Sequence, residues 1–282
     1  MTSTARRLRP NGIASDVTRW VPSSRRMLQC TVRECGRPLV RESNRVACSR
    51  GHSFDIARSG YINLLQPQDR RSKSPGDTPE AVAARRRLHD LGITAALYEA
   101  VAALANVSSS GTVLDVGCGE GYYLGQLQRE TKCNAHGVDI SIPAIDAAAR
   151  RYHACEWVVA NADRVVPYTD AVFTCILSIT GRRPVTEFLR VLQPGGRVLV
   201  AIPAEDDLIE LRGAGQDRRA RTLAEFTPLF RLMEQRRVTS RAQLDGDSIE
   251  DLRHAIYRPI TIELARAMPI TFSLDLLLFE AS

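Results

Sequence analysis

The sequence contains almost no lysine: Lys73 and Lys132 are the two lysines among 38 basic residues, and the others are arginines. This bias reflects genome composition as much as selection for phosphate binding, so the net charge of +6 alone does not predict a nucleic-acid-binding protein. No segment approaches the roughly 18 consecutive apolar residues of a membrane helix. The first 27 residues also lack the apolar core of a signal peptide. These absences exclude a membrane-spanning or secreted class and predict a cytoplasmic protein without a membrane partner.

The basic charge is concentrated in an N-terminal tail, residues 1–27. This tail accounts for +5 of the net charge, because one acid, Asp16, stands against six arginines: Arg6, Arg7, Arg9, Arg19, Arg25 and Arg26. We predict that the tail is disordered. It either steers the protein toward RNA by electrostatic attraction or is only a leader or the product of a misplaced start codon.

Three further regions follow, without an internal repeat. Residues 28–66 are short, polar and cysteine-bearing, and residues 67–108 are a connector with helices predicted over 80–90 and 94–106. Residues 109–282 alternate between strand-like and helical runs. Strands are predicted at 112–116, 134–139, 156–160, 171–178, 197–202 and 271–280, with a weaker one at 236–243. Helices are predicted at 120–130, 142–151, 184–192, 205–213, 220–230 and 247–255.

This alternation predicts an α/β fold whose sheet is mostly parallel, with right-handed crossovers. The final run, at 271–280, has no helix after it. We therefore expect it to be an antiparallel last strand of an otherwise parallel sheet.

A glycine loop follows the first predicted strand of the sheet. Residues 113–121 read VLDVGCGEG, so Asp115 lies near the tip of a buried strand and glycines recur at alternate positions after it. Such glycines permit a tight turn and let a ligand approach the backbone closely. A dinucleotide site has the spacing G-x-G-x-x-G and receives a pyrophosphate, which Asp115 and Glu120 would repel. The acids suit a cofactor with a cationic ammonium and sulfonium and no phosphate, namely S-adenosylmethionine.

Residues at the ends of the next strands complete the predicted cofactor site. Asp139 ends the second strand, where a carboxylate can bond both ribose hydroxyls. Asn161, Ala162 and Asp163 follow the third strand and are placed to face the adenine edge. The run 193–197 (QPGGR) resembles the LxPGG turn of S-adenosylmethionine-dependent methyltransferases. The predicted fold class is therefore α/β, a Rossmann-like class I methyltransferase sheet with a small N-terminal module.

The predicted cofactor-binding residues are Asp115, Gly117, Gly119, Glu120, Gly121, Tyr122, Tyr123, Asp139, Ile140, Asn161, Ala162, Asp163 and Ser178. For the two tyrosines, simple packing is the alternative. Because all of these residues lie after residue 112, we expect the C-terminal region to hold the cofactor by itself.

A second cluster of chemically active residues lies near the N-terminus. Cys30, Cys35, Cys48 and His52 offer three thiols and one imidazole, which is a known tetrahedral zinc set. A segment of this length buries too little core to fold alone, so a structural zinc ion would stabilise it. The alternative is a ribbon remnant that has lost its metal. The sequence favours a zinc-ribbon-like module over residues 28–66.

Six short segments carry a family resemblance: Cys35–Leu39 (CGRPL), Gly51–Asp55 (GHSFD), Gly60–Leu65 (GYINLL), Arg71–Asp77 (RSKSPGD), Ala84–Arg86 (ARR) and Asp115–Tyr123 (DVGCGEGYY). Together they resemble the 23S rRNA (guanine-N1)-methyltransferase family, some members of which confer macrolide resistance. The resemblance implies methyl transfer to guanine N1 in a 23S rRNA hairpin, a zinc-binding module that helps hold this RNA, and a homodimer. It also implies RNA contacts from residues 28–90, among them Arg70, Arg71, Lys73 and the run Arg85–Arg87.

The sequence departs from the family pattern in four places. The first cysteine pair is separated by four residues instead of two, and Ile93-Thr94 replaces a tyrosine that contacts the cofactor. Ser178–Pro184 (SITGRRP) replaces a run similar to I-Y-A-P, and residues 213–222 lack an expected histidine. Since the last three departures lie near the substrate side, the sequence defines the target nucleotide less well than the cofactor.

Two residues are catalytic candidates, because methyl transfer to guanine N1 needs an oriented acceptor and a group that takes the N1 proton. Asp77 could be this group, or it could form an Asx turn or helix cap before Pro79. Arg182, with Arg183, could grip a phosphate or base edge, or could begin a solvated helix. Two other functions stay open: a small-molecule methyltransferase of a natural-product pathway, and a non-catalytic RNA-binding relative. The zinc-like module argues against the first and the complete cofactor loop against the second.

Overall fold

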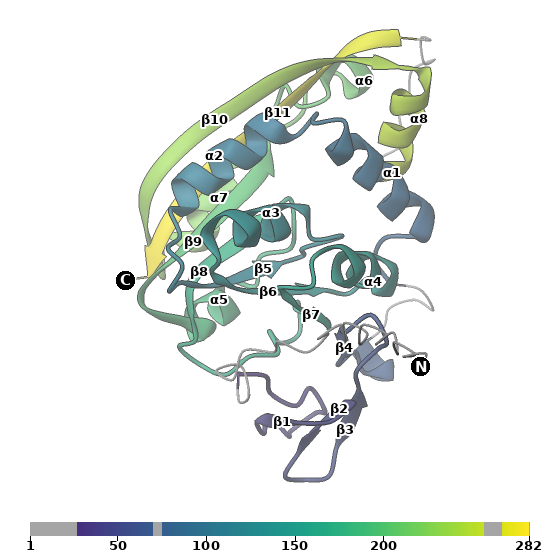
Figure 1. Ribbon diagram of the computed structural model, residues 1–282. Helices are drawn as coiled ribbons and strands as arrows, with labels where there is room; N and C mark the ends of the chain where they lie inside the picture. The colour runs from purple at the N-terminus through teal and green to yellow at the C-terminus, as the bar shows by residue number, and fades with distance from the viewer. Residues whose placement is uncertain (1–26, 70–74, 257–266, 282) are drawn as a thin grey trace, which may run out of the picture.

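The computed structural model describes residues 27–69, 75–256 and 267–281, so the tail up to residue 26 and Arg70, Arg71 and Lys73 lie outside the described residues. Its centre is an eight-stranded sheet in the order β10-β11-β9-β8-β5-β6-β7-β4 (Figure 1). The strands are β4 (Ile62–Asn63), β5 (Thr112–Val116), β6 (Asn134–Asp139), β7 (Glu156–Val159), β8 (Phe173–Ile179), β9 (Leu192–Pro203), β10 (Phe230–Asp245) and β11 (Ala267–Ala281).

The sheet is parallel from β4 to β9 and changes direction at its last strand. Each neighbouring pair in this part is parallel, and Asp115 of β5 lies opposite Gly137 of β6. Strand β11 is antiparallel to both of its neighbours, β9 and β10. The predicted α/β fold with an antiparallel last strand is therefore confirmed. In this topology the carboxyl ends of β5 to β9 meet at one edge of the sheet, where ligands bind in such folds.

Helices cover both faces of the sheet, and this explains why its central strands are apolar on both sides. One face carries α2 (Ala95–Ala105), α3 (Tyr122–Thr131) and α4 (Ile142–Arg151), whose buried side chains share one core with the sheet. The other face carries α5 (Val185–Val191) and α7 (Arg219–Phe226), with Phe188 and Phe226 fully buried. The result is a three-layer sandwich (Figure 1).

Three helices lie at the end of the sandwich where the long strand β10 ends and the long strand β11 begins. They are α1 (Pro79–Asp90), α6 (Ile209–Arg212) and α8 (Gly246–Ala255). Leu88, Leu211 and Leu252, one from each helix, share a small core with the two strands. Thr78 begins α1, because its hydroxyl accepts a hydrogen bond from the Ala81 amide at 3.2 Å.

The N-terminal ribbon is a three-stranded antiparallel sheet of β1 (Leu39–Glu42), β2 (Arg45–Cys48) and β3 (Ser53–Asp55), followed by β4 and a short 3-10 helix at Pro67–Asp69. It is joined to the main sheet, since Ile62 of β4 pairs with Val158 of β7 in parallel. Buried Leu28, Leu39 and Val46 belong to the same core as α5 and α7. The sequence does not foresee this junction, and the domain boundaries at 27, 66 and 108 stay a prediction.

Two elements differ from the sequence prediction. A helix predicted at 205–213 is reduced to α6, because Leu208 adopts a left-handed backbone conformation with φ 54° that ends the turn before it. The weak strand at 236–243 is instead the 16-residue β10, whose whole length pairs with β11. Within the described residues, no single helix is long and apolar enough to cross a membrane; α1 and α2 reach that length only as a pair bent by 85°.

Candidate functional site: a cofactor cavity and a zinc cluster

The four predicted zinc ligands converge in the ribbon. Cys30 precedes the strands, Cys35 lies in the turn that follows it, and Cys48 and His52 flank the turn between β2 and β3. Their ligand atoms all lie within 4.8 Å of one another. Cys35 Sγ lies 3.8 Å from Cys48 Sγ, and His52 Nδ1 lies 3.4 Å from Cys30 Sγ and 3.5 Å from Cys48 Sγ.

These separations fit one tetrahedral zinc ion. Zn–S bonds of about 2.3 Å and a Zn–N bond of about 2.0 Å require ligand atoms about 3.5–3.8 Å apart. The wide spacing between Cys30 and Cys35 does not displace Cys30, because its backbone amide bonds the Arg37 carbonyl at 2.8 Å and holds the strand beside the turn. The unusual spacing is therefore compatible with a complete set of three thiols and one imidazole.

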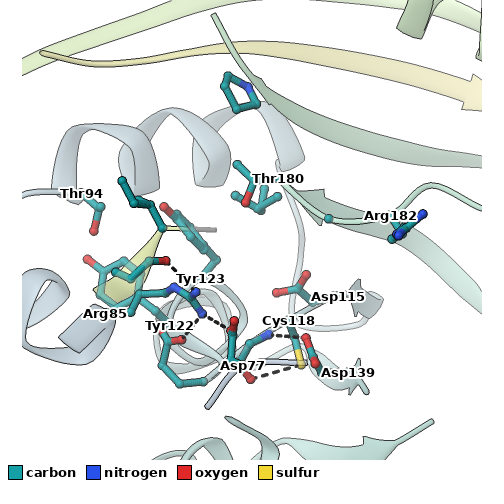
Figure 2. Close-up of a pocket in the computed structure, with 18 of the residues that line it drawn as sticks. Asp77, Arg85, Thr94, Asp115, Cys118, Tyr122, Tyr123, Asp139, Thr180 and Arg182 are labelled. Atoms are coloured by element: carbon teal, nitrogen blue, oxygen red, sulfur yellow. Dashed lines mark hydrogen bonds and ion pairs between the residues drawn. The ribbon is translucent and has the colours of Figure 1, made fainter. Parts of the chain in front are cut away.

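A cavity of about 850 Å³ lies at the carboxyl edge of the sheet. Figure 2 shows Asp77, Asp115 and Asp139 grouped beside the glycine loop, while Arg182 points away from them. Eleven of the thirteen predicted cofactor-binding residues line this cavity: Asp115, Gly117, Gly119, Glu120, Tyr122, Tyr123, Asp139, Ile140, Asn161, Ala162 and Asp163. The two others, Gly121 and Ser178, do not line it.

Gly121 and Ser178 have roles inside the chain. A Cβ atom on Gly121 would lie 2.3 Å from the ring of Trp157, and the residue has a φ of +77°, so packing and backbone conformation both require glycine there. The hydroxyl of buried Ser178 donates to the carbonyl of Arg182 at 3.3 Å and so closes the turn after β8. Residues within this turn, including Thr180, line the cavity in its place.

Asp115 is prepared for a cationic ligand. It is buried, and its Oδ1 has no hydrogen-bond partner among the described residues. Burial, with the neighbouring carboxylates of Asp139 and Glu120, raises the pKa of Asp115 to about 8. A buried acceptor without a partner is costly, and an ammonium or sulfonium group would relieve that cost. The site therefore fits S-adenosylmethionine, whose sulfonium also makes the methyl group electrophilic.

Asp139 holds the glycine loop in place. Its two carboxylate oxygens accept hydrogen bonds from the backbone amides of Gly119 at 3.0 Å and Ser141 at 2.8 Å. Burial nevertheless raises the pKa of Asp139 above its usual value. A carboxylate can accept about four hydrogen bonds, so these contacts leave capacity for the ribose hydroxyls that the sequence predicts as its partners.

Two residues of α1 complete the cavity, although sequence analysis does not assign them to it. His89 Nε2 lies 3.0 Å from Glu120 Oε1, and the His89 ring stacks on Tyr122 with centroids 4.0 Å apart. Arg85 Nη1 lies 3.4 Å from Glu120 Oε2. Burial opposes ionisation of Glu120, but the contacts with His89 and Arg85 outweigh it, so the pKa of Glu120 lies below its usual value.

Arg85 also contacts the catalytic candidate Asp77, at 2.5 Å between Nη1 and Oδ2. The guanidinium of Arg85 points into the cavity (Figure 2). The prediction that Arg85 contacts RNA phosphate stays untested. Asp77 is not the helix cap, which is Thr78. The prediction that residues after 112 hold the cofactor by themselves stays a prediction, and Gly76, Asp77, Arg85 and His89 line the same cavity.

The loop after β7 is anchored to the ribbon. Asn161 donates from its side-chain amide to the Asp69 carbonyl at 3.0 Å and accepts from the Asp163 amide at 3.1 Å. Both polar ends of Asn161 thus have partners within the chain. Arg164, three residues on, pairs with Asp69 at 2.9 Å, and Asp163 lies 3.5 Å from the exposed guanidinium of Arg182. The part of the cavity wall after β7 is therefore anchored to Asp69 at the end of the ribbon.

Comparisons with known proteins agree with both parts of this description. Residues 28–73 match the zinc-ribbon family described as RlmA, N-terminal, and residues 113–196 match the family described as Methyltransferase domain. A 23S rRNA (guanine(748)-N(1))-methyltransferase of Streptomyces fradiae is 34% identical over 79% of this chain and 82% of its own length. A protein of Bacillus subtilis named provisionally as a 23S rRNA (guanine-N(1)-)-methyltransferase is 32% identical, over 66% of this chain and 67% of its own.

One solved structure shows the same fold. It is a chain of the complex between the Haloferax volcanii Trm112 methyltransferase activator and a methyltransferase, which aligns with a TM-score of 0.50 and 21% identity over 74% of this chain and 99% of its own. Fold, cavity and family match together define a class I S-adenosylmethionine-dependent methyltransferase with a zinc ribbon. Within this class, the chain belongs to the 23S rRNA (guanine-N1)-methyltransferase family.

Proposed function

We propose that this enzyme methylates N1 of a guanine in a hairpin of 23S rRNA, in the cytoplasm, where ribosomal RNA is made. The observation that carries the proposal is the direct attachment of a zinc ribbon to the wall of a methyl-donor cavity. The Streptomyces fradiae relative, 34% identical, is named for guanine 748. The counterpart of that guanine is therefore the first position to map.

The ribbon supplies a surface that suits RNA. Its exposed arginines are Arg33, Arg37, Arg41, Arg45, Arg50 and Arg58. Arginine binds phosphate and stacks on unpaired bases, which are the usual contacts with hairpin loops. These residues take the place of the run at Arg85–Arg87 in the proposed RNA surface, since Arg85 points into the cavity and Arg87 pairs with Asp251 at 2.5 Å. The homodimer that the family resemblance implies stays a prediction.

The cofactor would be held by both halves of the cavity. We assign the ribose to Asp139, the cationic methionyl end to the group of Asp115 and Glu120, and the adenine to the loop of Ala162 and Asp163. The buried unpartnered oxygen of Asp115 supports this orientation. His89 and Arg85 position Glu120 and keep it ionised.

Labelled S-adenosylmethionine and unmodified total rRNA, incubated with the enzyme, test the proposal. We expect one labelled guanine in 23S rRNA, detected as a block to reverse transcription, because a methyl group on N1 prevents Watson–Crick pairing. Zinc-loaded protein with Asp115→Asn is the matched control and should label little. Label in small molecules of a cell extract, with none in rRNA, would overturn the proposal and favour the small-molecule alternative.

A further inference from the structure

The cavity has a second wall that the cofactor does not account for. It is formed by the loop after β9, by β10 and β11, and by the end of α8, with the lining residues Pro203, Asp207, Leu208, Arg212, Arg218, Val238, Ser240, Leu252, Ala255, Ile256, Phe272 and Leu274. The cofactor residues come instead from β5 to β8 and the connector. An acceptor must reach the methyl group from this same cavity, so the second wall is the place to look for acceptor contacts.

Four side chains of β10 and β11, three of them apolar, line this wall side by side. Val238 lies opposite Leu274, and Ser240 lies opposite Phe272. Because side chains alternate along a strand, these four face the cavity together while their neighbours face away. Nucleic acid bases stack on exposed aromatic side chains in this way, with any base order. The wall therefore has the shape and chemistry of a platform for one planar base.

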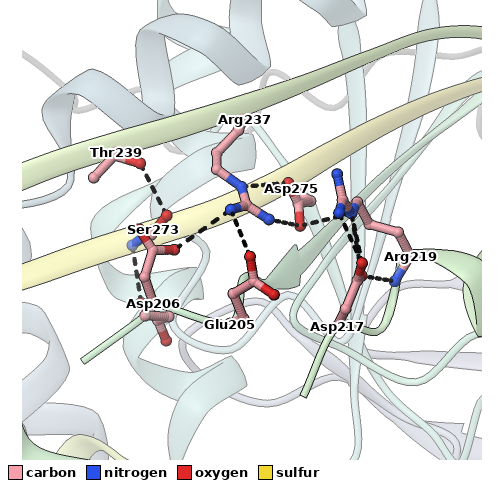
Figure 3. Close-up of polar contacts among 9 residues, drawn as sticks. Glu205, Asp206, Asp217, Arg219, Arg237, Thr239, Ser273 and Asp275 are labelled. Atoms are coloured by element: carbon pink, nitrogen blue, oxygen red, sulfur yellow. Dashed lines mark hydrogen bonds and ion pairs between the residues drawn. The ribbon is translucent and has the colours of Figure 1, made fainter. Parts of the chain in front are cut away.

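The outer side of the platform is fixed by polar contacts (Figure 3). Arg237 donates to both oxygens of buried Asp275, at 2.8 and 3.0 Å, and Thr239 Oγ1 lies 2.9 Å from Ser273 Oγ. These pairs alternate with the cavity-facing residues along the same two strands. They hold the register of β10 on β11, so that the platform is rigid before a base arrives.

Asp207 lies beside the platform. Its Oδ1 accepts the backbone amide of Ser273 at 3.0 Å, and the amide of Leu208 bonds the Thr271 carbonyl at 2.8 Å. Phe272 lies between these two anchors in the strand, and Asp207 and Phe272 both line the cavity. The charged groups around Asp207 are Asp206 on its own loop, Arg212 of α6 and Arg218 before α7.

Other carboxylates of the cavity are engaged elsewhere. Among the described residues, Asp77 pairs with Arg85, Glu120 contacts His89, and Asp163 pairs with Arg182. Asp115 and Asp139 end the strands beneath the glycine loop, where the cofactor belongs. Asp207 is thus the carboxylate that the second wall contributes to the cavity.

We propose that Asp207 accepts the Watson–Crick edge of the target guanine and removes its N1 proton, while the platform of Val238, Ser240, Phe272 and Leu274 supports the base. This inference rests on the proposed function. The N1 proton passes to the Asp207 carboxylate, and the N1 electron pair forms the new bond to the methyl carbon of S-adenosylmethionine. The electron pair of the broken C–S bond leaves with sulfur as S-adenosylhomocysteine, and Asp207 then releases its proton to water.

The protonation behaviour of Asp207 is consistent with this role. Burial raises its pKa to about 6, so the carboxylate is ionised near neutral pH yet is a stronger base than an exposed aspartate. The rate of methylation should rise with pH through this value and level off above it, because only the ionised carboxylate can accept the proton.

Single-turnover methylation of an unmodified 23S rRNA fragment by zinc-loaded, full-length enzyme tests the inference. Asp207→Asn should slow the reaction roughly 100-fold or more and abolish the rise near pH 6. Affinities for S-adenosylmethionine and for the RNA should stay within about threefold. Asp170→Asn is the matched control, since it makes the same substitution at an exposed aspartate outside the cavity and should change neither rate nor profile.

Two outcomes would overturn the inference while leaving the proposed function intact. One is a wild-type enzyme that methylates the guanine without a rise near pH 6. The other is an Asp207→Asn variant with the wild-type rate. If the Asp207→Asn variant does not fold, Asp207→Glu provides the test. This variant should methylate more slowly than the wild type, and its rate should still rise with pH on the acid side of the pH profile. A wild-type enzyme that leaves guanine N1 unmodified would instead refute the proposed function itself.

Discussion

Arg164 donates a hydrogen bond from Nη2 to the main-chain oxygen of Thr31, although 133 residues separate them in the chain. Thr31 follows Cys30 of the zinc cluster, and Arg164 belongs to the loop after β7, part of which lines the cofactor cavity. The same guanidinium pairs with Asp69, whose side chain is 3% exposed. A short, mostly buried path therefore joins the metal cluster to the cofactor site.

This path predicts that zinc supports cofactor binding. Arg164→Met should weaken S-adenosylmethionine binding by about 1–2 kcal/mol, since hydrogen bonds from a partly exposed charged group are lost. Removal of zinc from the wild-type protein should cause a similar loss, and removal from the variant should add little. Calorimetric titration of both proteins, with and without zinc, measures this coupling. If zinc removal lowered the affinity for S-adenosylmethionine equally in the wild type and in the Arg164 variant, the coupling would be contradicted. Arg150→Met, which breaks an exposed ion pair with Asp146, is the control.

The zinc cluster predicts one zinc ion per chain, with Cys30 as a full ligand. Cys30→Ser should lower zinc affinity by more than the roughly 10–100-fold that is typical of outer-sphere residues. Chelator competition followed by elemental analysis measures the change. Cys155→Ser, a thiol outside the cluster, should leave the zinc content unchanged. Full affinity in the Cys30 variant would show that another group completes the site.

The ribose assignment predicts the effect of changes at Asp139. Asp139→Ala should weaken S-adenosylmethionine binding by roughly 1.5–3 kcal/mol, because charge-assisted hydrogen bonds to the ribose are lost. Part of the loss would come from the glycine loop, since Asp139 also holds the amides of Gly119 and Ser141. Asp139→Asn retains one acceptor and should lose less. Calorimetry on folded variants measures both, and an unchanged affinity would refute the assignment.

Cofactor binding should depend on pH through Asp115. Its pKa is raised to about 8, so near pH 7 the carboxyl of the ligand-free protein mostly holds a proton. A cationic ligand favours the ionised carboxylate, and binding must then release this proton. Affinity should therefore increase as pH rises toward 8, by up to about tenfold per pH unit. Calorimetric titrations near neutral pH, in buffers of different ionisation enthalpy, count the protons released when the cofactor binds. The Asp115→Asn variant should release no proton on binding. Equal proton release from the wild type and from this variant would contradict the account.

Gly121 should matter for stability more than for cofactor contact. Gly121→Ala places a methyl group 2.3 Å from Trp157 at a φ of +77° and should lower the free energy of unfolding by about 2–4 kcal/mol. Gly195→Ala has a similar φ, +70°, with nothing within 4 Å, and should cost only about 1 kcal/mol. Chemical denaturation measures the free energy of unfolding of both variants, and the difference between their losses separates the clash with Trp157 from the backbone strain. Equal losses would mean that Trp157 moves aside.

The local features of the protein were readable from its sequence. The strand at 112–116, the alternating glycines after it and the acid at Asp139 were predicted in their observed places, because strand period and turn chemistry depend on near neighbours. The spacing of Cys35, Cys48 and His52 also indicated the zinc cluster. Even the antiparallel last strand followed from a local fact, the absence of a helix after it.

The tertiary structure alone decided which distant residues share the site. Arg85 resembled its neighbours in a basic run, and only the packing of α1 over the glycine loop turns it toward Asp77 and Glu120. His89 carried no motif. Asp207 lies in the cavity wall because its carboxylate accepts a hydrogen bond from the Ser273 amide of β11. These contacts span 8 to 66 residues. Their energies depend on burial and on partners that a local pattern does not contain.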